Sequence, residues 1–422
     1  MQVIQIEGSK KPLFSWCENP EQNALDQIVA IAKLPFVEHC AWMADGHMGN
    51  DVPIGSVVST NGIVVPNWIG SDCGCGICVV KTSLKREDII DRELRLKILN
   101  SFMRGIPVGF NHNSTQRQKE LEQKYSNKVD YVISKSNVEN VCSSPFKNGT
   151  EREIVYSNVG TLGSGNHWAS IEYDESDNVW LMVHSGSRNI GAKINDHFND
   201  LAKKQNEMWN SIPSVSSFLP AVSEEGKAFL AWMDFGLRFA FLNRLVMIEE
   251  MQKDLQHIIN KKIEYDEMIN IHHNYASLEN HFGKNVWVHR KGATLAVQGQ
   301  LGIIPGNQGD ATYIVEGIGE KNGKGNPNSL YSCSHGAGRT MGRTEFNRQF
   351  NTQEQIEKIR DIMKDVVYIN FPKEKTRKGN ETGNLDLSEC PLAYKNIEKV
   401  MMAQKDLVKP IHKLMPMVNM KG

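Results

Sequence analysis

The longest regular pattern in this chain is helical. Residues 223–263 place an apolar side chain at every third or fourth position, which predicts one long buried helix or two shorter ones. Glu224 and Glu225 stand in the first turn, where the helix dipole favours acidic groups. Helical spacing also predicts helices at 86–104, 352–367 and 394–415, and a polar helix or a mobile surface segment at 115–135.

Short apolar runs between glycine and proline residues predict strands elsewhere. Residues 52–83 indicate tightly turned strands on both sides of a glycine-rich loop. Residues 179–183, Val-Trp-Leu-Met-Val, predict a buried strand that ends at His184. Residues 285–317 return to short strands with glycines at the turns. Helices and strands follow one another irregularly, so we expect an α+β fold with mixed β-sheets surrounded by helices.

Nothing in the sequence divides the chain into separate domains. It contains no fixed-period repeat and no low-complexity linker. We therefore expect a single domain over residues 1–422, with a helical insertion around 190–265. A polar, solvated loop is expected at 372–381, which contains Lys373, Lys375, Arg377 and Lys378.

Charge and cysteine content narrow the class of protein. With 48 basic and 49 acidic side chains the net charge is -1, so a nucleic-acid partner would need a local positive patch. Eight cysteines at irregular spacing do not form a disulfide framework, and the first residues lack the features of a signal peptide. No apolar run approaches the roughly 20 residues that span a bilayer. We expect a cytoplasmic protein that does not enter a membrane.

The glycine-rich loop carries two side chains that suit a metal ion. Two residues separate Asp72 from Cys75, and Gly74 between them allows the tight turn that would aim both at one cation. A thiolate can also bridge two ions. Cys75 and Cys78 form a Cys-x-x-Cys pair, typical of a zinc knuckle or a redox motif, but no second close-spaced pair completes a knuckle.

Histidines in similar settings extend this set. His167 follows Gly163-Ser164-Gly165-Asn166, whose amides could hold a phosphate, and His184 ends the predicted strand. His272 and His273 are adjacent, and because neighbouring side chains diverge on a regular element we expect only one of them to be a ligand. Imidazole, thiolate and carboxylate together suit Zn, Mn or Co, so these residues indicate a metal site for phosphoryl chemistry.

His335 lies in a turn with almost no large side chains, Ser334-His335-Gly336-Ala337-Gly338-Arg339. Such a turn lets a phosphate approach the backbone amides while a ring nitrogen faces phosphorus, although a surface turn that happens to hold a histidine fits equally well. The segment Asp45-Gly46-His47 could surround the metals, contact substrate or form an ordinary turn. The candidate substrate contacts are Asp45, His47, Arg188 and Arg339.

Together these motifs resemble the RtcB RNA ligases, which use GTP and manganese to join RNA 2′,3′-cyclic phosphate or 3′-phosphate ends to 5′-hydroxyl ends. The resemblance runs in order over nearly the whole chain and implies a single RtcB-like domain with a dimetal active-site cleft. It is carried by Asp45-Gly46-His47, residues 70–76, 160–167 and 184–188, His273-Asn274, Arg290-Lys291-Gly292-Ala293, Pro305-Gly306, residues 334–339, Tyr394-Lys395 and Lys421-Gly422.

The resemblance implies a role for each candidate. Two Mn²⁺ ions would be held by Asp72, Cys75, His167, His184 and His273, with Cys75 as the bridge. His335 would be the nucleophile that becomes guanylylated and passes GMP to an RNA 3′-phosphate, and a 5′-hydroxyl would then displace GMP. The guanine nucleotide would contact Asn166, Asn274, Pro305, Gly306, Asn307, Gln308, Thr312, Gly336, Ala337, Gly338 and Lys421, with Lys421 at the base.

Three positions depart from the family pattern. Ser170 stands where the family usually has a glutamate associated with guanine recognition. Glu172, on the same face of the predicted strand, could substitute for it, or the nucleotide preference could be relaxed. The turn at 306–309 is Gly-Asn-Gln-Gly instead of Gly-Ser-Met-Gly, and Asn189 replaces a glycine. We expect these changes to affect nucleotide and RNA preference and to leave the metals and nucleophile intact.

The sequence leaves two other functions open. A metal-dependent phosphoesterase or cyclic phosphodiesterase would keep the metal centre without the nucleotidyl step, and a non-enzymatic RNA-binding protein would keep only the fold. The intact candidate ligand set argues against the non-enzymatic protein, and of the three functions we favour the ligase. Its substrate would be tRNA or another structured RNA with broken ends, in splicing or in repair, and an accessory protein that activates guanylylation is compatible with the resemblance.

Overall fold

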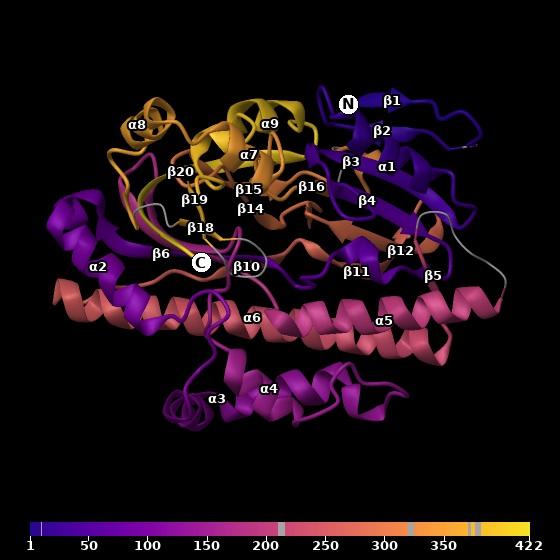
Figure 1. Cartoon of the computed structure of the whole chain (residues 1–422), viewed down its shortest axis with the longest axis horizontal. Helices are drawn as coiled ribbons and strands as arrows, with labels where there is room; N and C mark the ends of the chain where they lie inside the picture. Colours follow the sequence, from indigo (N-terminus) through magenta and orange to yellow (C-terminus); the bar gives the residue numbers. More distant parts are fainter. Residues whose placement is uncertain (10, 210–215, 320–324, 370–372, 376–380) are drawn as a thin grey trace.

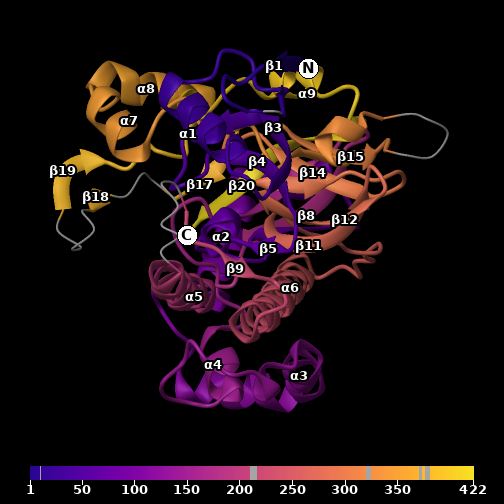
Figure 2. The same cartoon turned by 90° about the vertical axis from the view of Figure 1, so that its right-hand side faces the viewer.

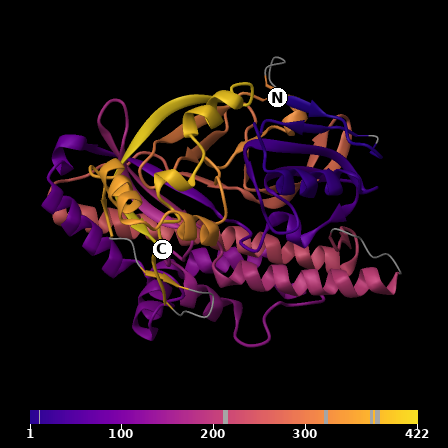
Figure 3. The same cartoon turned by 45° about the horizontal axis from the view of Figure 1, so that its top comes forward.

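A computed structural model describes residues 1–9, 11–209, 216–319, 325–369, 373–375 and 381–422. It confirms the α+β fold. Mixed sheets lie on one side of two long helices, α5 (Asn189–Met208) and α6 (Glu224–Ile259), and the helices α3 (Thr115–Ser136) and α4 (Glu151–Asn158) lie on the other side (Figures 1 and 2). The N-terminal strands, drawn in indigo, occupy one half of the molecule and the C-terminal segments, drawn in yellow, the other half (Figure 3).

One sheet is built from the N-terminal strands and a later hairpin. Among the described residues its strands follow the order β1-β2-β3-β4-β12-β11, with only the β2–β3 pair parallel. The strands are β1 Gln2–Ile4, β2 Leu13–Ser15, β3 Val37–His47, β4 Ile54–Thr60, β11 Asn274–His281 and β12 Lys284–Lys291. Strand β3 delivers Asp45 and His47 at its end, and β11 begins at Asn274, so this sheet supplies candidates from two distant parts of the chain.

The second sheet carries most of the predicted metal ligands at its strand ends. In the described part of the chain its order is β10-β6-β8-β7-β20-β15-β14, with β17 beside β20. The strands are β6 Gly76–Lys85, β7 Trp168–Tyr173, β8 Asn178–Ser185, β10 Ile269–His272, β14 Leu301–Pro305, β15 Thr312–Gly317, β17 Val367–Tyr368 and β20 Val408–Lys421. Short pairs join β5 Ile63–Val64 to β9 Leu219–Pro220, β13 Ala293–Leu295 to β16 Ser332–Ser334, and β18 Lys373–Lys375 to β19 Glu381–Leu385.

Strand β8 is buried on both faces, as its continuous apolar run predicted. Leu181 and Val183 pack with Met247 of α6 on one side of the sheet. Met182 packs with Ile303 and other apolar residues on the opposite side. A strand buried in this way holds its last residues firmly, and His184 is one of them.

The helices cover the sheets and extend away from them. They are α1 Gln22–Ala32, α2 Arg92–Gly105, α3 Thr115–Ser136, α4 Glu151–Asn158, α5 Asn189–Met208, α6 Glu224–Ile259, α7 Arg343–Gln349, α8 Gln353–Ile362 and α9 Ile397–Ala403. Helix α6 is continuous: the Ser223 side chain accepts a hydrogen bond from the Gly226 amide at its start, and Asn260 ends it in the left-handed conformation. None of the helices described is both long and apolar enough to cross a membrane. Whether 190–265 is an insertion stays a prediction.

The prediction of a final helix at 394–415 is wrong. Helix α9 covers only Ile397–Ala403, and the chain then continues as strand β20. Pro410 and Pro416 lack the amide hydrogen that a helix interior requires, and the pairing of β20 with β7 shifts register beside Pro416.

Two other predicted boundaries changed. The helix predicted at 352–367 ends at Ile362, although its predicted capping box forms between Thr352 and Gln355. In the basic segment 372–381, Lys373 and Lys375 belong to β18 instead of a loop, and Pro372, Arg377 and Lys378 lie outside the described residues.

Candidate active site

The turn before β6 brings Asp72 and Cys75 together. The Cys75 amide donates to the Asp72 carbonyl at 3.0 Å. Gly74 has a φ of +79°, and a Cβ there would lie 3.0 Å from atoms of α6, so this position requires glycine. The Gly74 amide donates to the Asn274 carbonyl at 2.8 Å, and the His273 amide donates to the Cys75 carbonyl at 2.9 Å. These bonds fasten the turn to the segment that carries His273.

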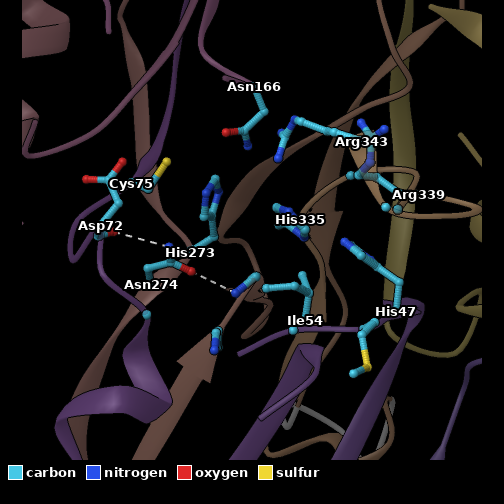
Figure 4. Close-up of a pocket in the computed structure, with 18 of the residues that line it drawn as sticks. His47, Ile54, Asp72, Cys75, Asn166, His273, Asn274, His335, Arg339 and Arg343 are labelled. Carbon is cyan, nitrogen blue, oxygen red and sulfur yellow. Dashed lines mark hydrogen bonds between the residues drawn. The ribbon is translucent and has the colours of Figure 1, made fainter. Parts of the chain in front are cut away.

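The five predicted ligands gather beside this turn. Cys75 Sγ lies 3.4 Å from Nε2 of His167 and 3.4 Å from Nε2 of His184. Asp72 Oδ2 lies 3.0 Å from Nε2 of His167, and the ring centroids of His184 and His273 are 5.2 Å apart. Their ligand atoms form two groups that share Cys75, namely Cys75-His184-His273 and Asp72-Cys75-His167, each within 4.8 Å. In Figure 4, Asp72, Cys75 and His273 lie on one side of the pocket.

The donors in this cluster fit a divalent metal. Burial lowers the pKa of His184 and of His273 well below the usual range, so both imidazoles are neutral, as metal ligands must be. His167 Nδ1 lies 3.0 Å from the Leu162 carbonyl, which orients the ring with Nε2 toward Cys75 and Asp72. Nδ1 of His273 is buried and has no hydrogen-bond partner among the described residues. Imidazole, carboxylate and thiol are the donor types that a borderline cation prefers.

Ser187 holds Asp72 in place. Its amide and its hydroxyl donate to Oδ1 of Asp72 at 2.8 and 2.9 Å. Burial tends to raise the pKa of Asp72, but hydrogen bonds from His167 and Ser187 outweigh burial and lower it to about 2. The carboxylate is therefore ionised, with Oδ2 left on the side of His167.

Arg244, in the middle of α6, holds two ligand-bearing segments. It is fully buried, and its Nη1 donates to the carbonyls of Gly74 at 2.9 Å and Ser185 at 2.8 Å, the residues next to Cys75 and His184. Within the described chain it forms no ion pair with a carboxylate. The sequence did contain a signal, because the polar pair Asn243-Arg244 interrupts the apolar stripe of this helix.

The structure also separates residues that the sequence left ambiguous. His272 points away from the cluster, where its Nδ1 lies 3.1 Å from Nη2 of Arg244, and burial lowers its pKa to about 3. Only His273 of this pair joins the cluster. Cys78 packs in the apolar core with Leu181, so it does not pair with Cys75 in a knuckle.

His335 faces the cluster from the other side of the pocket. Its Nδ1 lies 2.5 Å from Oδ2 of Asp45, and its amide donates to the same oxygen at 3.2 Å. Asp45 is completely buried; burial tends to raise its pKa, but attraction to His335 outweighs burial and lowers it. An ionised carboxylate can only accept, so Nδ1 of His335 carries a hydrogen, and in the neutral imidazole the lone pair is then on Nε2. Its ring centroid is 4.7 Å from that of His273.

The cluster and His335 line one cavity of about 1010 Å³. The predicted contacts found in its wall are Asn166, Asn274, Pro305, Gly306, Asn307, Gln308, Gly336, Ala337, Gly338, Lys421, His47 and Arg339. Figure 4 shows His335 between the metal-ligand candidates and the side where His47 and Arg339 lie. The wall formed by the described residues does not include Asp45, which lies behind His335, nor Thr312 or Arg188.

Comparison with known proteins identifies the family. The sequence model of a family described as "tRNA-splicing ligase RtcB" matches residues 27–422. The RNA-splicing ligase RtcB of Escherichia coli (strain K12) is 36% identical over 426 residues, which cover 97% of each chain. The tRNA-splicing ligase RtcB of Methanococcus maripaludis is 27% identical, over 96% of this chain and 92% of its own. The chain belongs to the RtcB family. It is an RNA ligase, as the sequence predicted.

Ser170, one of the three positions expected to depart from the family pattern, lies behind the cavity. Ser170 and Glu172 are both buried on β7, and the Ser170 hydroxyl donates to Oε1 of Glu172 at 2.8 Å. Burial raises the pKa of Glu172 to about 7. Thr312, on β15, is 2% exposed and lies near this carboxyl. Neither Ser170 nor Glu172 belongs to the cavity wall as the structure describes it.

Ion pairs hold several charged groups in the wall of the cavity. Arg339 and Arg343 both contact Oε1 of Glu389, at 3.3 and 2.9 Å. Lys421 Nζ lies 2.6 Å from Oδ2 of Asp386. Arg343, Asp386 and Glu389 were not identified from the sequence, because the partners lie on segments that carry no recognisable motif.

Proposed function

We propose that this chain is a GTP- and Mn²⁺-dependent ligase that joins RNA 2′,3′-cyclic phosphate or 3′-phosphate ends to 5′-hydroxyl ends. The observation that carries the proposal is the hydrogen bond between His335 Nδ1 and Asp45 Oδ2, 2.5 Å long. It leaves the lone pair of Nε2 for nucleophilic attack, in a cavity that also contains five metal-ligand candidates.

The reaction begins at Nε2 of His335. This nitrogen attacks the α-phosphorus of GTP, a nitrogen–phosphorus bond forms, and pyrophosphate leaves with the electrons of the broken phosphorus–oxygen bond. The carboxylate of Asp45 stabilises the positive charge that the imidazole gains. An oxygen of the RNA 3′-phosphate then attacks the same phosphorus and restores His335. The 5′-hydroxyl of the second RNA attacks the activated 3′-phosphate, and GMP leaves.

The remaining candidates bind and orient the reactants. Asp72, Cys75, His167, His184 and His273 would hold two Mn²⁺ ions, with Cys75 shared between them. When bound, these ions neutralise charge on phosphate oxygens and activate the water that opens a cyclic phosphate. The turn at 305–308, the loop at 336–338 and the side chains of Asn166, Asn274 and Lys421 line the same cavity and would hold the guanine nucleotide.

A covalent-adduct experiment tests the proposal. Incubation with Mn²⁺ and GTP labelled at the α-phosphate is expected to give an acid-labile, histidine-linked label on the protein. His335→Ala should abolish the label, whereas His257→Ala, at an exposed position in the last turn of α6, should keep it. If the wild type forms no adduct with any of several divalent metals, the proposal fails. Hydrolysis of RNA cyclic phosphate ends without GTP would then support a phosphoesterase.

A further inference from the structure

Phe110 is the most exposed large apolar side chain in the described part of the chain. It lies between α2 and α3, and its side chain is 91% exposed. The residues that follow it, Asn111 and His112, are polar and exposed. An exposed phenylalanine ring offers apolar surface whose burial against a partner would be favourable.

The turn that carries Phe110 is anchored at both ends. The Gly109 amide donates to the Gly163 carbonyl at 2.7 Å, and the Leu162 amide donates to the Pro107 carbonyl at 2.9 Å. After the turn, the Asn113 side chain donates to the carbonyls of Tyr156 at 2.9 Å and Val159 at 2.8 Å. The aromatic ring therefore stands on fixed backbone and loses little conformational entropy when it binds a partner.

The anchoring segment is also part of the active site. Gly163 lies against His167, because a Cβ on Gly163 would be 2.4 Å from Nδ1 of that histidine. The amide of Gly422, next to Lys421 of the cavity wall, donates to the His167 carbonyl at 2.9 Å. The side chain of Arg188 donates to the Gly109 carbonyl and so joins the same contact. Phe110 thus lies on a turn bonded to the segment that leads into Asn166 and His167 of the cavity wall.

A nucleobase suits this ring better than a protein surface does. A stable protein interface buries about 800 Å² on each partner, and the apolar surface at this turn is a single ring followed by polar residues. A base offers a flat face of similar size and needs no further apolar surface, and single-stranded nucleic acids bind aromatic side chains in this way. RNA is the polymer on which this enzyme family acts, so a strand passes near the cavity in every reaction.

We propose that Phe110 is a stacking platform for a nucleobase close to the reacting end of the RNA substrate. This inference rests on the proposed ligase function, which brings two RNA strands to the cavity. Either the strand that ends in a 3′-phosphate or the strand that begins with a 5′-hydroxyl supplies the base. The ring would stack on a base of either strand in the same way, and the experiment distinguishes which strand supplies the base.

The test uses fluorescence of 2-aminopurine, which stacking quenches. Two single-stranded RNAs, one ending in a 3′-phosphate and one beginning with a 5′-hydroxyl, carry the probe at the first, second or third nucleotide from that end. Wild-type protein is expected to quench one position in one of the two strands. Phe110→Ala should remove this quenching and weaken binding of that RNA about tenfold. Phe110→Tyr should preserve both.

Phe282→Ala is the matched control, since Phe282 is also exposed, at 61%, but lies in the turn between β11 and β12, at the opposite end of that hairpin from Asn274 and Lys291 of the cavity wall. Unchanged quenching in Phe110→Ala, absence of quenching at every probe position, or an equal loss in Phe282→Ala would overturn the proposal. So would a dimer, detected by light scattering, that Phe110→Ala dissociates without altering RNA binding. The assay needs neither GTP nor ligation, so a missing histidine adduct would reject the proposed function without deciding this one.

Discussion

The two walls of the cavity hold their polar groups by different means. The ligand wall consists of the predicted metal ligands Asp72, Cys75, His167, His184 and His273. There Cys75 and the histidines around it direct donor atoms toward one another. The cation behind them, Arg244, binds backbone carbonyls. On the nucleophile wall, which carries His335, several polar groups are paired with protein carboxylates, as His335 is with Asp45 and Lys421 is with Asp386.

This difference separates two tasks. Buried donors that converge have most of their lone pairs unused, so a cation is the partner that satisfies them. Groups already paired with a carboxylate are fixed in orientation and protonation before any substrate arrives, which favours a nucleophile and phosphate-binding cations. The ligand wall is therefore suited to binding metal, and the nucleophile wall to positioning His335 and the nucleotide.

The largest effect that tests this separation is expected from Asp45→Asn. The amide cannot stabilise the charge on His335, and its NH₂ group can favour the wrong imidazole tautomer. The rate of adduct formation with labelled GTP should fall by roughly 10²–10⁴-fold. Manganese stoichiometry, measured by equilibrium dialysis, should stay that of the wild type, because Asp45 is not among the converging donors.

Asp406→Asn is a suitable control for this change, since Asp406 binds the Trp16 indole outside the cavity and should tolerate the loss of charge. If Asp45→Asn loses manganese as well as guanylylation, the two walls are not independent and the comparison fails.

The ligand wall was the more predictable of the two. Asp72 and Cys75 belong to one short turn, and His184 ends a strand whose apolar run is continuous, so local sequence indicated where each side chain would lie. The adjacency rule also predicted that one member of the His272–His273 pair would turn away, although it could not say which. Their roles as ligands stay predictions.

The nucleophile wall was less predictable because its pairs form between distant segments. Glu389 and Asp386 follow β19 in a segment without a motif, and nothing local indicates that they meet Arg339 and Lys421. Lys291 did belong to a motif that carried the resemblance, Arg290-Lys291-Gly292-Ala293. The sequence did not indicate, however, that Lys291 lies in the cavity wall, where burial lowers its pKa to about 8. The helix predicted at 394–415 failed for the same reason: β20 is fixed by its pairing with β7 and β15.

A buried carboxyl behind the nucleophile wall breaks the pattern of paired charges. Oε2 of Glu172 has no hydrogen-bond partner among the described residues, and burial raises the pKa of this group to about 7 from 4.5. Between pH values of about 4.5 and about 7 the folded protein therefore binds more protons than the unfolded chain does. The free energy of unfolding falls as the pH rises through this range. Glu172→Gln keeps an acceptor for Ser170 and should raise the free energy of unfolding at pH 8 by roughly 3 kcal/mol.

Urea unfolding of this variant and the wild type at pH 5 and pH 8 measures the difference. The gain should be small at pH 5, where Glu172 is neutral in the folded state. Glu398→Gln should act in the opposite direction at pH 8, because Lys413 and Tyr313 donate to that carboxylate and lower its pKa. An equal gain from Glu172→Gln at both pH values would show that its charge is not the cause.

A smaller effect on the ligand wall is expected from Arg244→Met. Methionine fills much of the same space but cannot donate to the carbonyls beside Cys75 and His184, so the converging donors should lose their fixed spacing. Residues that orient metal ligands commonly contribute 10- to 100-fold to metal affinity, and we expect manganese binding to weaken by about this factor. Adduct formation should then recover as the manganese concentration is raised, which a general loss of folding would not allow.

Arg238→Met, on the same helix but paired with Asp234 at the surface, should bind manganese normally. If Arg244→Met lowers the unfolding temperature and leaves manganese affinity unchanged, Arg244 stabilises α6 alone, and the ligand wall keeps its geometry without a buried cation behind it.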